Sequence, residues 1–399
     1  MKACVNVAAN ADDRLTQSQQ GWLRVRDFLN SRRCELAGAA KDLYPQHWRV
    51  AGTPLLARPE WLPGAPVPLE QVALSWHPGR LPAQITGTEP AFAAALPLSG
   101  GGARFGSYAA ALGALRRPAL FEDRACYRLL EAQSTPAIAK LGFGEGRYFE
   151  VINTVEAVAH EYAAATLASA GAGRPPDMTE LPARSLIGEP TDLSRRPAMA
   201  ALCTLVLRAD PHRGDAAMIL HWRDPARVAS GGGMYQVAPV GVFQPSHDAE
   251  WNQVNDFSLW RCFVRELAEE LLGGGEDYHS GTAPIDYERW PLQAGLAAAR
   301  RAGRLRVYWL GLGTDPLTLA TDMLTVAVFD AEEFDATFAG LVRANAEGHI
   351  VGPDGAGAAV GVAFKAPNIE RFTAAEPMQP AGAALLRIAW EHRDVLLVG

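Results

Sequence analysis

The chain lacks the features that mark several classes of protein. Its 399 residues carry 37 basic and 44 acidic side chains, and the formal net charge is −7. Without a basic excess, the chain is not expected to bind nucleic acid or an anionic membrane through charge. No stretch approaches the roughly 18 apolar residues of a membrane span, and nothing near Met1 resembles a signal peptide. We therefore expect a cytoplasmic protein with no membrane or nucleic-acid partner.

Cysteine is also scarce, and several known motifs are incomplete. The five cysteines lie far apart, and none forms a Cys-x-x-Cys pair. An odd number without that spacing predicts neither a disulfide framework nor structural zinc. The glycine-rich segment 99–106 lacks the ending of a phosphate-binding loop, and His160-Glu161 lacks the second histidine of a zinc helix. No helix-turn-helix pattern stands out.

Apolar residues, glycine and proline are present in quantity. Apolar residues make up 48% of the chain, which is enough to fill a core and excludes a largely disordered protein. Residues 173–197 combine prolines with polar residues and show no periodicity, as an exposed connection does. We expect an N-terminal α+β domain of unassigned fold at 1–172, a linker at 173–197 and a second domain at 198–399.

Apolar periodicity predicts the main elements of both parts. The expected helices are 17–40, 150–170, 255–272, 331–345 and 380–393, and the expected strands are 201–208, 217–222, 235–243, 305–311 and 323–329. In the second part, strands surround one central helix and a further helix closes the chain. This order predicts an α/β domain with helices on both faces of a sheet, and the fold class of the whole chain is α+β / α/β.

The helix expected at 255–272 is the most informative segment. Its apolar side chains recur at intervals of three and four residues, so one face belongs to the core. Glu266, Glu269 and Glu270 gather on the opposite face. Crowded carboxylates either point into water or share a cation, and hard oxygen ligands of this kind suit Mg²⁺ or Mn²⁺. From the spacing alone, three carboxylates that point into water are favoured over three that share a cation.

Residues 265–270 read Arg-Glu-Leu-Ala-Glu-Glu, which resembles the core of the box that defines Nudix hydrolases. Two strands precede this segment, and Pro239-Val-Gly241 resembles the turn that opens the box. The resemblance covers about residues 198–395 and implies a Nudix-like α/β/α sandwich. It also implies a metal-dependent hydrolase that cleaves a phosphoanhydride in a nucleoside diphosphate derivative.

The resemblance assigns roles to individual residues. Glu266, Glu269 and Glu270 would be catalytic and would bind Mg²⁺ or Mn²⁺. Arg265 would be structural, pairing with an acid that fixes the preceding loop, and Gly241 would be the structural glycine of the box. The substrate would be a small nucleotide-like molecule.

The sequence departs from the family pattern in front of the helix. The loop between Gly241 and Arg265 is longer than in the family, and the glutamate expected inside it is absent. Asp248, Glu250 or Asp256 could replace that glutamate, and nothing in the sequence selects among them. The remodelled loop favours a second hypothesis, in which a Nudix-fold module binds or senses a nucleotide-like ligand and does no chemistry.

Three further residues are candidates for the site. Some Nudix enzymes use an acid from a late loop as general base, and Asp322 is such an acid here. Asp322 could equally be the exposed start of a strand. Arg223 and Arg227 could bind a substrate phosphate or belong to a solvated hairpin. The sequence leaves open the identity of the substrate and whether the chain forms a homodimer.

Overall fold

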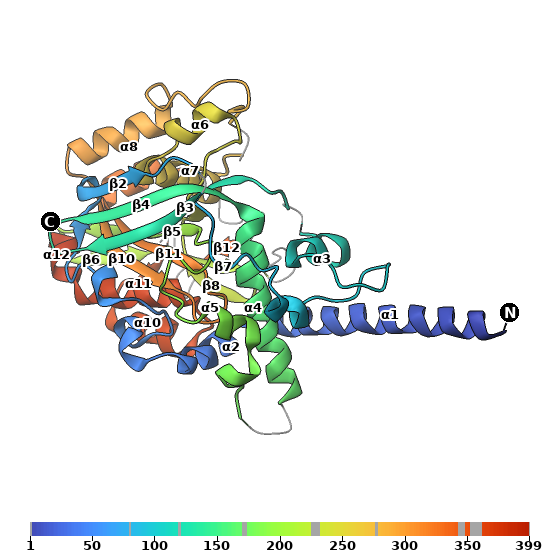
Figure 1. Cartoon of the computed structure of the whole chain (residues 1–399). Helices are drawn as coiled ribbons and strands as arrows, with labels where there is room; N and C mark the ends of the chain where they lie inside the picture. The colour runs from blue at the N-terminus through green and yellow to red at the C-terminus, as the bar shows by residue number, and fades with distance from the viewer. Residues whose placement is uncertain are drawn as a thin grey trace.

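The computed structural model describes residues 2–79, 81–118, 121–169, 174–224, 232–275, 278–341, 348–351 and 361–398. The helices are α1 (Lys2–Ser31), α2 (Arg33–Ala40), α3 (Tyr108–Leu115), α4 (Tyr148–Ala168), α5 (Pro182–Ile187), α6 (Glu250–Asn255), α7 (Leu259–Leu272), α8 (Pro291–Arg301), α9 (Ala331–Thr337), α10 (Ala366–Glu370), α11 (Pro380–Glu391) and α12 (Arg393–Val398). The strands are β1 (Val67–Pro68), β2 (Val72–Trp76), β3 (Ala125–Ser134), β4 (Ala139–Arg147), β5 (Ala200–Asp210), β6 (Asp215–Met218), β7 (Leu220–Arg223), β8 (Met234–Val237), β9 (Val240–Val242), β10 (Leu305–Thr314), β11 (Thr321–Asp330), β12 (Gly348–Ile350) and β13 (Val362–Ala363). Helices and mixed sheets together confirm the expected α+β / α/β class (Figure 1).

A seven-stranded sheet forms the centre of the molecule. Its strand order is β1-β10-β11-β5-β6-β13, and β9 pairs with β5 beside β6. Strands β5 and β11 run parallel, whereas the other neighbours run antiparallel. Both central strands are almost wholly buried. Near-continuous apolar sequence is typical of strands covered on both faces, which explains why periodicity located these two strands.

Two smaller sheets flank the central one. One has the order β12-β7-β8 and the other β2-β4-β3. In Figure 1, β3 and β4 lie across the front of the large sheet. Backbone hydrogen bonds join β3 to residues that flank β5 and β9, since the Leu129 amide donates to Ala198 at 2.7 Å and the Tyr127 amide donates to Phe243 at 3.3 Å.

Helices from different parts of the chain cover the sheets. Helix α11 packs on β5, β8, β10 and β11, α7 packs on β5 and β9, and α8 packs on β10. Helix α1 packs on α4 near its C-terminal end and extends away from the rest of the molecule (Figure 1). Among the described helices, none is long and apolar enough to cross a membrane.

Two of the predicted strands are interrupted. The strand expected at 217–222 divides at Ile219, because β6 pairs with β5 while β7 pairs with β8 and β12. The strand expected at 235–243 divides at Ala238-Pro239, and only its second piece joins the large sheet. Proline has no amide hydrogen for a ladder, so the interruption falls where a strand is weakest.

The hydrophobic core does not stop at the predicted linker. One continuous cluster contains Leu55, Val67 and Leu141 from the first part of the chain and Leu205 and Trp309 from the second. The indole of Trp309 donates to the Ser134 hydroxyl at 3.1 Å. Strand β1 also belongs to the large sheet through its pairing with β10. This cluster therefore has members on both sides of the predicted boundary.

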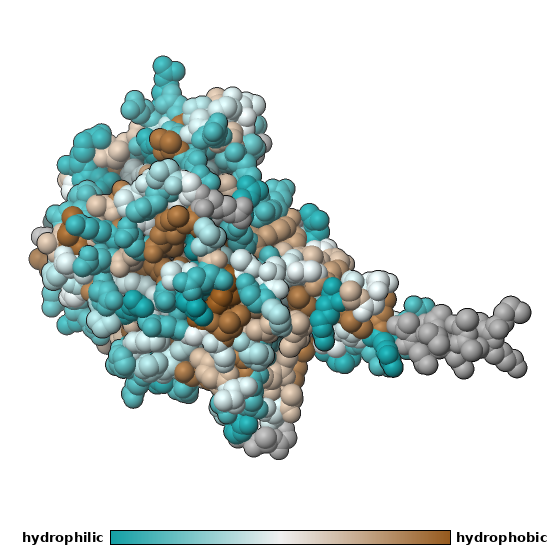
Figure 2. Space-filling view, in the orientation of Figure 1, coloured by the Kyte–Doolittle hydropathy of each residue, from teal (hydrophilic) through white to brown (hydrophobic). Residues whose placement is uncertain are grey.

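The visible surface carries only scattered apolar patches. Figure 2 shows mostly hydrophilic and intermediate residues, with the most apolar ones in small, separate groups. Helix α6 contributes two exposed apolar side chains, Trp251 and Val254. Single exposed apolar residues are normal on a folded protein and carry no functional conclusion.

Candidate functional site

Helix α7 carries the glutamates that the sequence singled out. The Ser258 side chain caps its first turn by accepting a hydrogen bond from the Arg261 amide, and Gly273 ends it in a left-handed conformation with φ of 70°. Val264, Leu267 and Leu271 are buried against the core. The glutamates lie on the side of the helix that meets β9 and the segment after α7.

The carboxylate of Glu266 lies directly against Gly241. A Cβ atom built on Gly241 would stand 1.8 Å from Cδ of Glu266 and 1.9 Å from Oε2. Any side chain at position 241 would therefore displace this carboxylate. The glycine is required for a close approach of helix and strand rather than for a special backbone angle. Gly241 therefore has a structural role in this contact.

The other two glutamates also bind parts of the chain. The Val240 amide in β9 donates to Oε1 of Glu270 at 3.1 Å. The hydroxyl of Tyr278 donates to Oε1 of Glu269 at 2.7 Å. Burial, with a smaller effect from Glu269, raises the pKa of Tyr278, so the hydroxyl keeps its proton and remains a donor. Glu270 thus joins α7 to the strand before it, and Glu269 joins α7 to the segment after it.

Arg265 holds the remodelled loop. Its guanidinium donates to the Tyr287 hydroxyl at 2.6 Å and to the Gln244 carbonyl at 2.7 Å, and it lies 3.5 Å from Oδ1 of Asp256. Arg265 is 3% exposed and Asp256 is fully buried. The carboxylate of Asp256 also accepts hydrogen bonds from Tyr287 and from the amide and hydroxyl of Ser246. These contacts fix the loop at both ends.

The three acids proposed as replacements for the missing glutamate have different roles. Asp256 is the buried partner of Arg265. Asp248 accepts hydrogen bonds from the Ala125 amide at 2.7 Å and from Arg147 at 2.9 Å. Partial burial raises the pKa of Asp248, but these donors outweigh it and the pKa lies below the ordinary value. Only Glu250, exposed at the start of α6, has no ion-pair partner in the described part of the chain.

Asp322 lies near the start of β11, where it is in register with Ala201 near the start of β5. The thiol of Cys203 donates to its Oδ1 at 3.4 Å. Burial, with the nearby charge of Asp315, raises the pKa of Asp322 to about 7, although the thiol hydrogen bond opposes the shift. Cys203 also lies close enough to Glu270 for that charge to raise the pKa of the thiol, after burial and Asp322. Asp322 and Glu270 therefore approach the same cysteine.

Of the two candidate arginines, the structure describes Arg223. Arg223 ends β7, a strand of the β12-β7-β8 sheet, whereas Gly241 and Asp322 belong to the large sheet. Its backbone pairs with Gly348 and Met234. Arg227 lies outside the described residues.

The described acids do not form a metal centre as they are arranged. Within the described ranges, no group of three or more histidine, cysteine, aspartate or glutamate side chains is placed to hold one ion. The contacts above give the reason, since Glu266, Glu269 and Glu270 are directed to Gly241, Tyr278 and Val240 respectively. We therefore assign no chemical step to Mg²⁺ or Mn²⁺.

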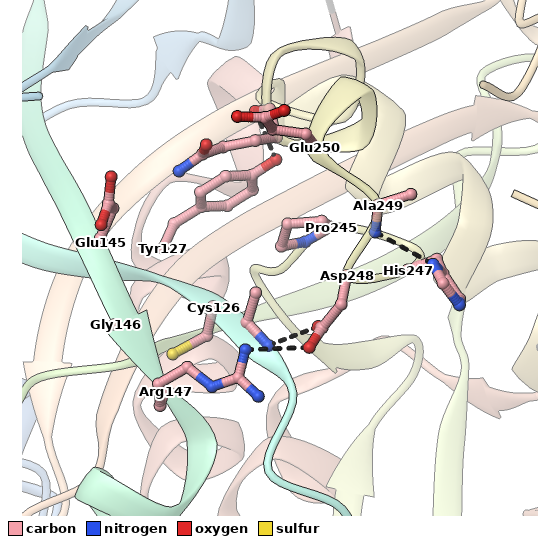
Figure 3. Close-up of a pocket in the computed structure, with 12 residues that line it drawn as sticks. Cys126, Tyr127, Glu145, Gly146, Arg147, Pro245, His247, Asp248, Ala249 and Glu250 are labelled. Carbon is pink, nitrogen blue, oxygen red and sulfur yellow. Dashed lines mark hydrogen bonds and ion pairs between the residues drawn. The ribbon is translucent and has the colours of Figure 1, made fainter. Parts of the chain in front are cut away.

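A pocket of about 270 Å³ lies between β3, β4 and the loop that Arg265 holds (Figure 3). Arg147, the one arginine or lysine among the described residues that line it, is neutralised by Asp248 at 2.9 Å and Asp123 at 3.4 Å. Glu145 and Glu250 line the same pocket and find no ion-pair partner among the described residues. This balance of charge disfavours a phosphate there.

The cysteine that lines this pocket, Cys126, is not deprotonated and is therefore a poor nucleophile. Burial, with Asp123 nearby, raises the pKa of Cys126 to about 12. The thiol therefore keeps its proton at neutral pH. His247 accepts a hydrogen bond from the Ala249 amide through Nδ1 at 3.0 Å, as Figure 3 shows, which places its ring proton on Nε2 when the ring is neutral.

A second pocket, of about 470 Å³, lies beside α7. Ala268 and Leu272 of α7, Leu292 of α8, and Tyr278 and Trp290 from the connection between them line it. Sequence reasoning missed these residues because they carry no motif and little charge. The aromatic residues of 278–290, in a segment with no clear periodicity, were the available signal.

Comparison with known proteins adds no identification. No family model matches this chain, and no curated protein is significantly similar to it. The Nudix resemblance therefore rests on residues 239–270 alone.

Proposed function

We propose that the chain is a binding module for a nucleotide-like small molecule and that α7 is its scaffold rather than a catalytic helix. The observation that supports this hypothesis is the engagement of α7 by the chain itself. Glu266 fills the space above Gly241, Glu269 accepts from Tyr278, and Glu270 accepts from the Val240 amide. Carboxylates that hold the fold in this way would have to break those contacts to gather around one ion.

These contacts give the acidic residues of the helix a structural role. A charge-assisted hydrogen bond contributes about 1.5–3 kcal/mol when it is partly buried. Glu269 fixes Tyr278, which lines the pocket beside α7, and Arg265 fixes the loop that lines the pocket in Figure 3. The helix thus determines the shape of both pockets.

Calorimetry and a phosphate-release assay together test the proposal. The chain is titrated with nucleosides, nucleoside mono-, di- and triphosphates and nucleotide sugars, each with and without Mg²⁺. We expect binding of at least one compound without Mg²⁺ and no release of phosphate. Turnover that requires Mg²⁺ would contradict the proposal, and so would an absence of binding to every compound.

A phosphoanhydride hydrolase is the second candidate, and Asp322 favours it. A carboxyl group with a pKa of about 7 suits a general base at neutral pH. In the same assay, a hydrolase would lose about 10²–10⁴ in kcat in Asp322→Asn or Glu266→Gln, with binding little changed. The expected cofactor of this candidate is still Mg²⁺ or Mn²⁺.

A further inference from the structure

The pocket in Figure 3 carries an excess of negative charge. The carboxylates of Glu145, Asp248 and Glu250 line it. Its one arginine among the described lining residues, Arg147, is held by Asp248 at 2.9 Å. His247 adds no positive charge, because its Nδ1 accepts a backbone hydrogen bond and so carries no proton. Among the described lining residues, two negative charges are therefore left without a positive one.

The two uncompensated carboxylates come from different elements. Glu145 lies in β4, Glu250 is the first residue of α6, and both are exposed. No hydrogen bond or ion pair engages either side chain within the part of the chain that the structure describes. Like charges on one pocket repel each other, and a cation placed between them reverses that repulsion.

A buried hydroxyl group belongs to the same pocket wall. Tyr127 is 1% exposed, and its hydroxyl donates to the Gln253 carbonyl at 2.9 Å. Burial, with Asp256 nearby, raises the pKa of Tyr127, so the hydroxyl keeps its proton. No described group donates to this hydroxyl, so its oxygen remains free to accept. Figure 3 shows Tyr127 between Glu145 and Glu250, with its hydroxyl on the side of Glu250.

This set of oxygen acceptors suits an ammonium group. An alkylammonium ion has three N–H donors and no acceptor. The Glu250 carboxylate and the Tyr127 hydroxyl offer acceptors to it, and the side-chain amide of Gln253 lines the same pocket. A metal ion fits less well, because the described residues place no group of three or more acidic, histidine or cysteine side chains around one point.

The size of the pocket and its apolar atoms restrict the ligand further. A volume of about 270 Å³ is slightly below the range of drug-sized sites, roughly 300–1,000 Å³. Ala125, Pro245 and Ala249 line the pocket beside the charged groups. A short methylene chain can lie against these side chains and lose contact with water. The pocket therefore fits a small molecule that has charged ends and an apolar middle.

We propose that this pocket binds a short-chain alkyl diamine. One ammonium group donates to Glu250 and to the Tyr127 hydroxyl, the other donates to Glu145, and the methylene chain lies against Pro245. The site takes neither a base nor a phosphate, so the assignment does not depend on the proposed function. Because charge supplies much of the recognition, affinity falls as the salt concentration rises.

Isothermal titration calorimetry at low salt tests the assignment with putrescine as the probe. Butanediol has the same chain length without charge, and butylamine carries one ammonium group instead of two. We expect one putrescine to bind per chain, butanediol not to bind, and butylamine to bind at least about threefold more weakly, since it reaches only one carboxylate.

Charge-removing variants locate the site. Glu145→Gln and Glu250→Gln should each lower the affinity for putrescine about three- to tenfold, and the double variant should lose measurable binding. Both residues are exposed, so the melting temperature should stay at the wild-type value. The matched control is Glu391→Gln, because Glu391 is an exposed glutamate at the end of α11 that does not line this pocket.

Three results would overturn the assignment. The first is an absence of putrescine binding, and the second is binding of butanediol as tight as that of putrescine. The third is a loss of affinity in Glu391→Gln as large as in the two pocket variants, which would mean that putrescine is attracted by the net charge of −7 rather than by this pocket. None of these results bears on nucleotide binding, which the titrations described above measure separately.

Discussion

Arg265 and Asp256 form a buried ion pair in which each member depends on the other. Replacing Arg265 by alanine leaves the fully buried Asp256 with an uncompensated charge and removes the donor to Gln244. Removal of one partner of a buried pair costs about 3–5 kcal/mol, and we expect Arg265→Ala to lower the free energy of unfolding by that amount. Urea denaturation measures the change.

The matched control for this variant is Arg213→Ala. Arg213 forms an exposed pair with Asp210 at 3.6 Å, and its side chain is 80% exposed. Its removal should change stability by less than about 0.5 kcal/mol. Equal effects in the two variants would show that Arg265 is a solvated residue that does not hold Asp256.

Gly241 and Glu266 are coupled by steric contact rather than by charge. In Gly241→Ala the new methyl group displaces the Glu266 carboxylate, whose flexible side chain can move. We expect a loss of about 1 kcal/mol. In a Glu266→Ala background the same substitution should cost much less, because the atoms that it meets are gone. The melting temperatures of wild type, the two single variants and the double variant give the coupling between the two positions. Additive losses of stability would contradict the close approach of Glu266 to Gly241.

Asp322 makes stability depend on pH. Its pKa is about 7 in the folded protein and 3.8 as the reference value, so the folded state binds the proton more tightly than the unfolded state. The stabilisation from this group is complete below about pH 4 and is lost as pH rises through 7. Asp322→Asn should remove a slope of up to about 1 kcal/mol per pH unit between pH 5 and 7.

The test of the pH dependence compares melting temperatures from pH 5 to 8. Asp335→Asn is the control, because Asp335 pairs with Arg208 at the surface and that hydrogen bond lowers its pKa. The difference between wild type and Asp322→Asn should grow as pH falls, whereas Asp335→Asn should run parallel to wild type in this range. A constant difference for Asp322→Asn would show that its carboxyl group is solvated.

Among the elements, those with a strong apolar pattern were predictable. Helix α7 and strands β5 and β11 lie within a few residues of their expected positions, because each buries a continuous apolar surface. The β4 strand was not predicted, since Gly142, Gly144 and Gly146 dilute its pattern. The glycines are explained only by tertiary structure, since a Cβ at Gly142 would meet the side chain of Glu131 at 2.5 Å on the neighbouring strand.

The candidate site was predictable only in part, for a related reason. The helical period places Glu266, Glu269 and Glu270 on one side of α7, which the structure shows. The period does not give their partners, because Gly241 and Tyr278 come from segments before and after the helix. The pocket walls of 278–292 depend on how an irregular connection folds back onto α7, and no local pattern encodes this.

Helices α1, α2 and α4 are joined by a buried cluster of charges. Glu156 in α4 pairs with Arg26 and Arg33, and all three are almost wholly buried. Burial raises the pKa of Glu156, but the two arginines outweigh it and hold the pKa at about 2. Because this pKa lies below the reference value of 4.5, the stabilisation is present above pH 4.5 and is lost as pH falls toward 2.

Glu156→Gln tests this junction between helices. It leaves two buried guanidinium groups without a carboxylate, and we expect a loss of about 3–5 kcal/mol together with faster proteolysis of α1. Glu35→Gln removes an exposed carboxylate that pairs with Arg32 and should change neither property by much. Unchanged protease resistance in Glu156→Gln would mean that apolar contacts alone dock α1.

At the scale of the whole molecule, one core spans the predicted linker. Strand β1 pairs with β10, Trp309 donates to Ser134, and residues 129 and 198 share a backbone hydrogen bond. A fragment that ends at 172 or begins at 198 would expose core residues on its cut surface. Chains of this length often divide into domains that fold separately, so whether the two parts of this chain fold together has to be measured.

We expect the two parts to unfold in one transition. Urea denaturation of the full chain should give coincident curves by tryptophan fluorescence and far-ultraviolet circular dichroism. Fragments 1–197 and 198–399, expressed separately, should lack the amide dispersion of folded proteins, and co-expression should restore a stable complex. The physical reason is that β10 and β11 lose the packing of β1 and of the β2-β4-β3 sheet when the first part is removed. Two separate transitions, or a 198–399 fragment with a dispersed spectrum and its own melting transition, would establish the division at 173–197 that the composition predicts.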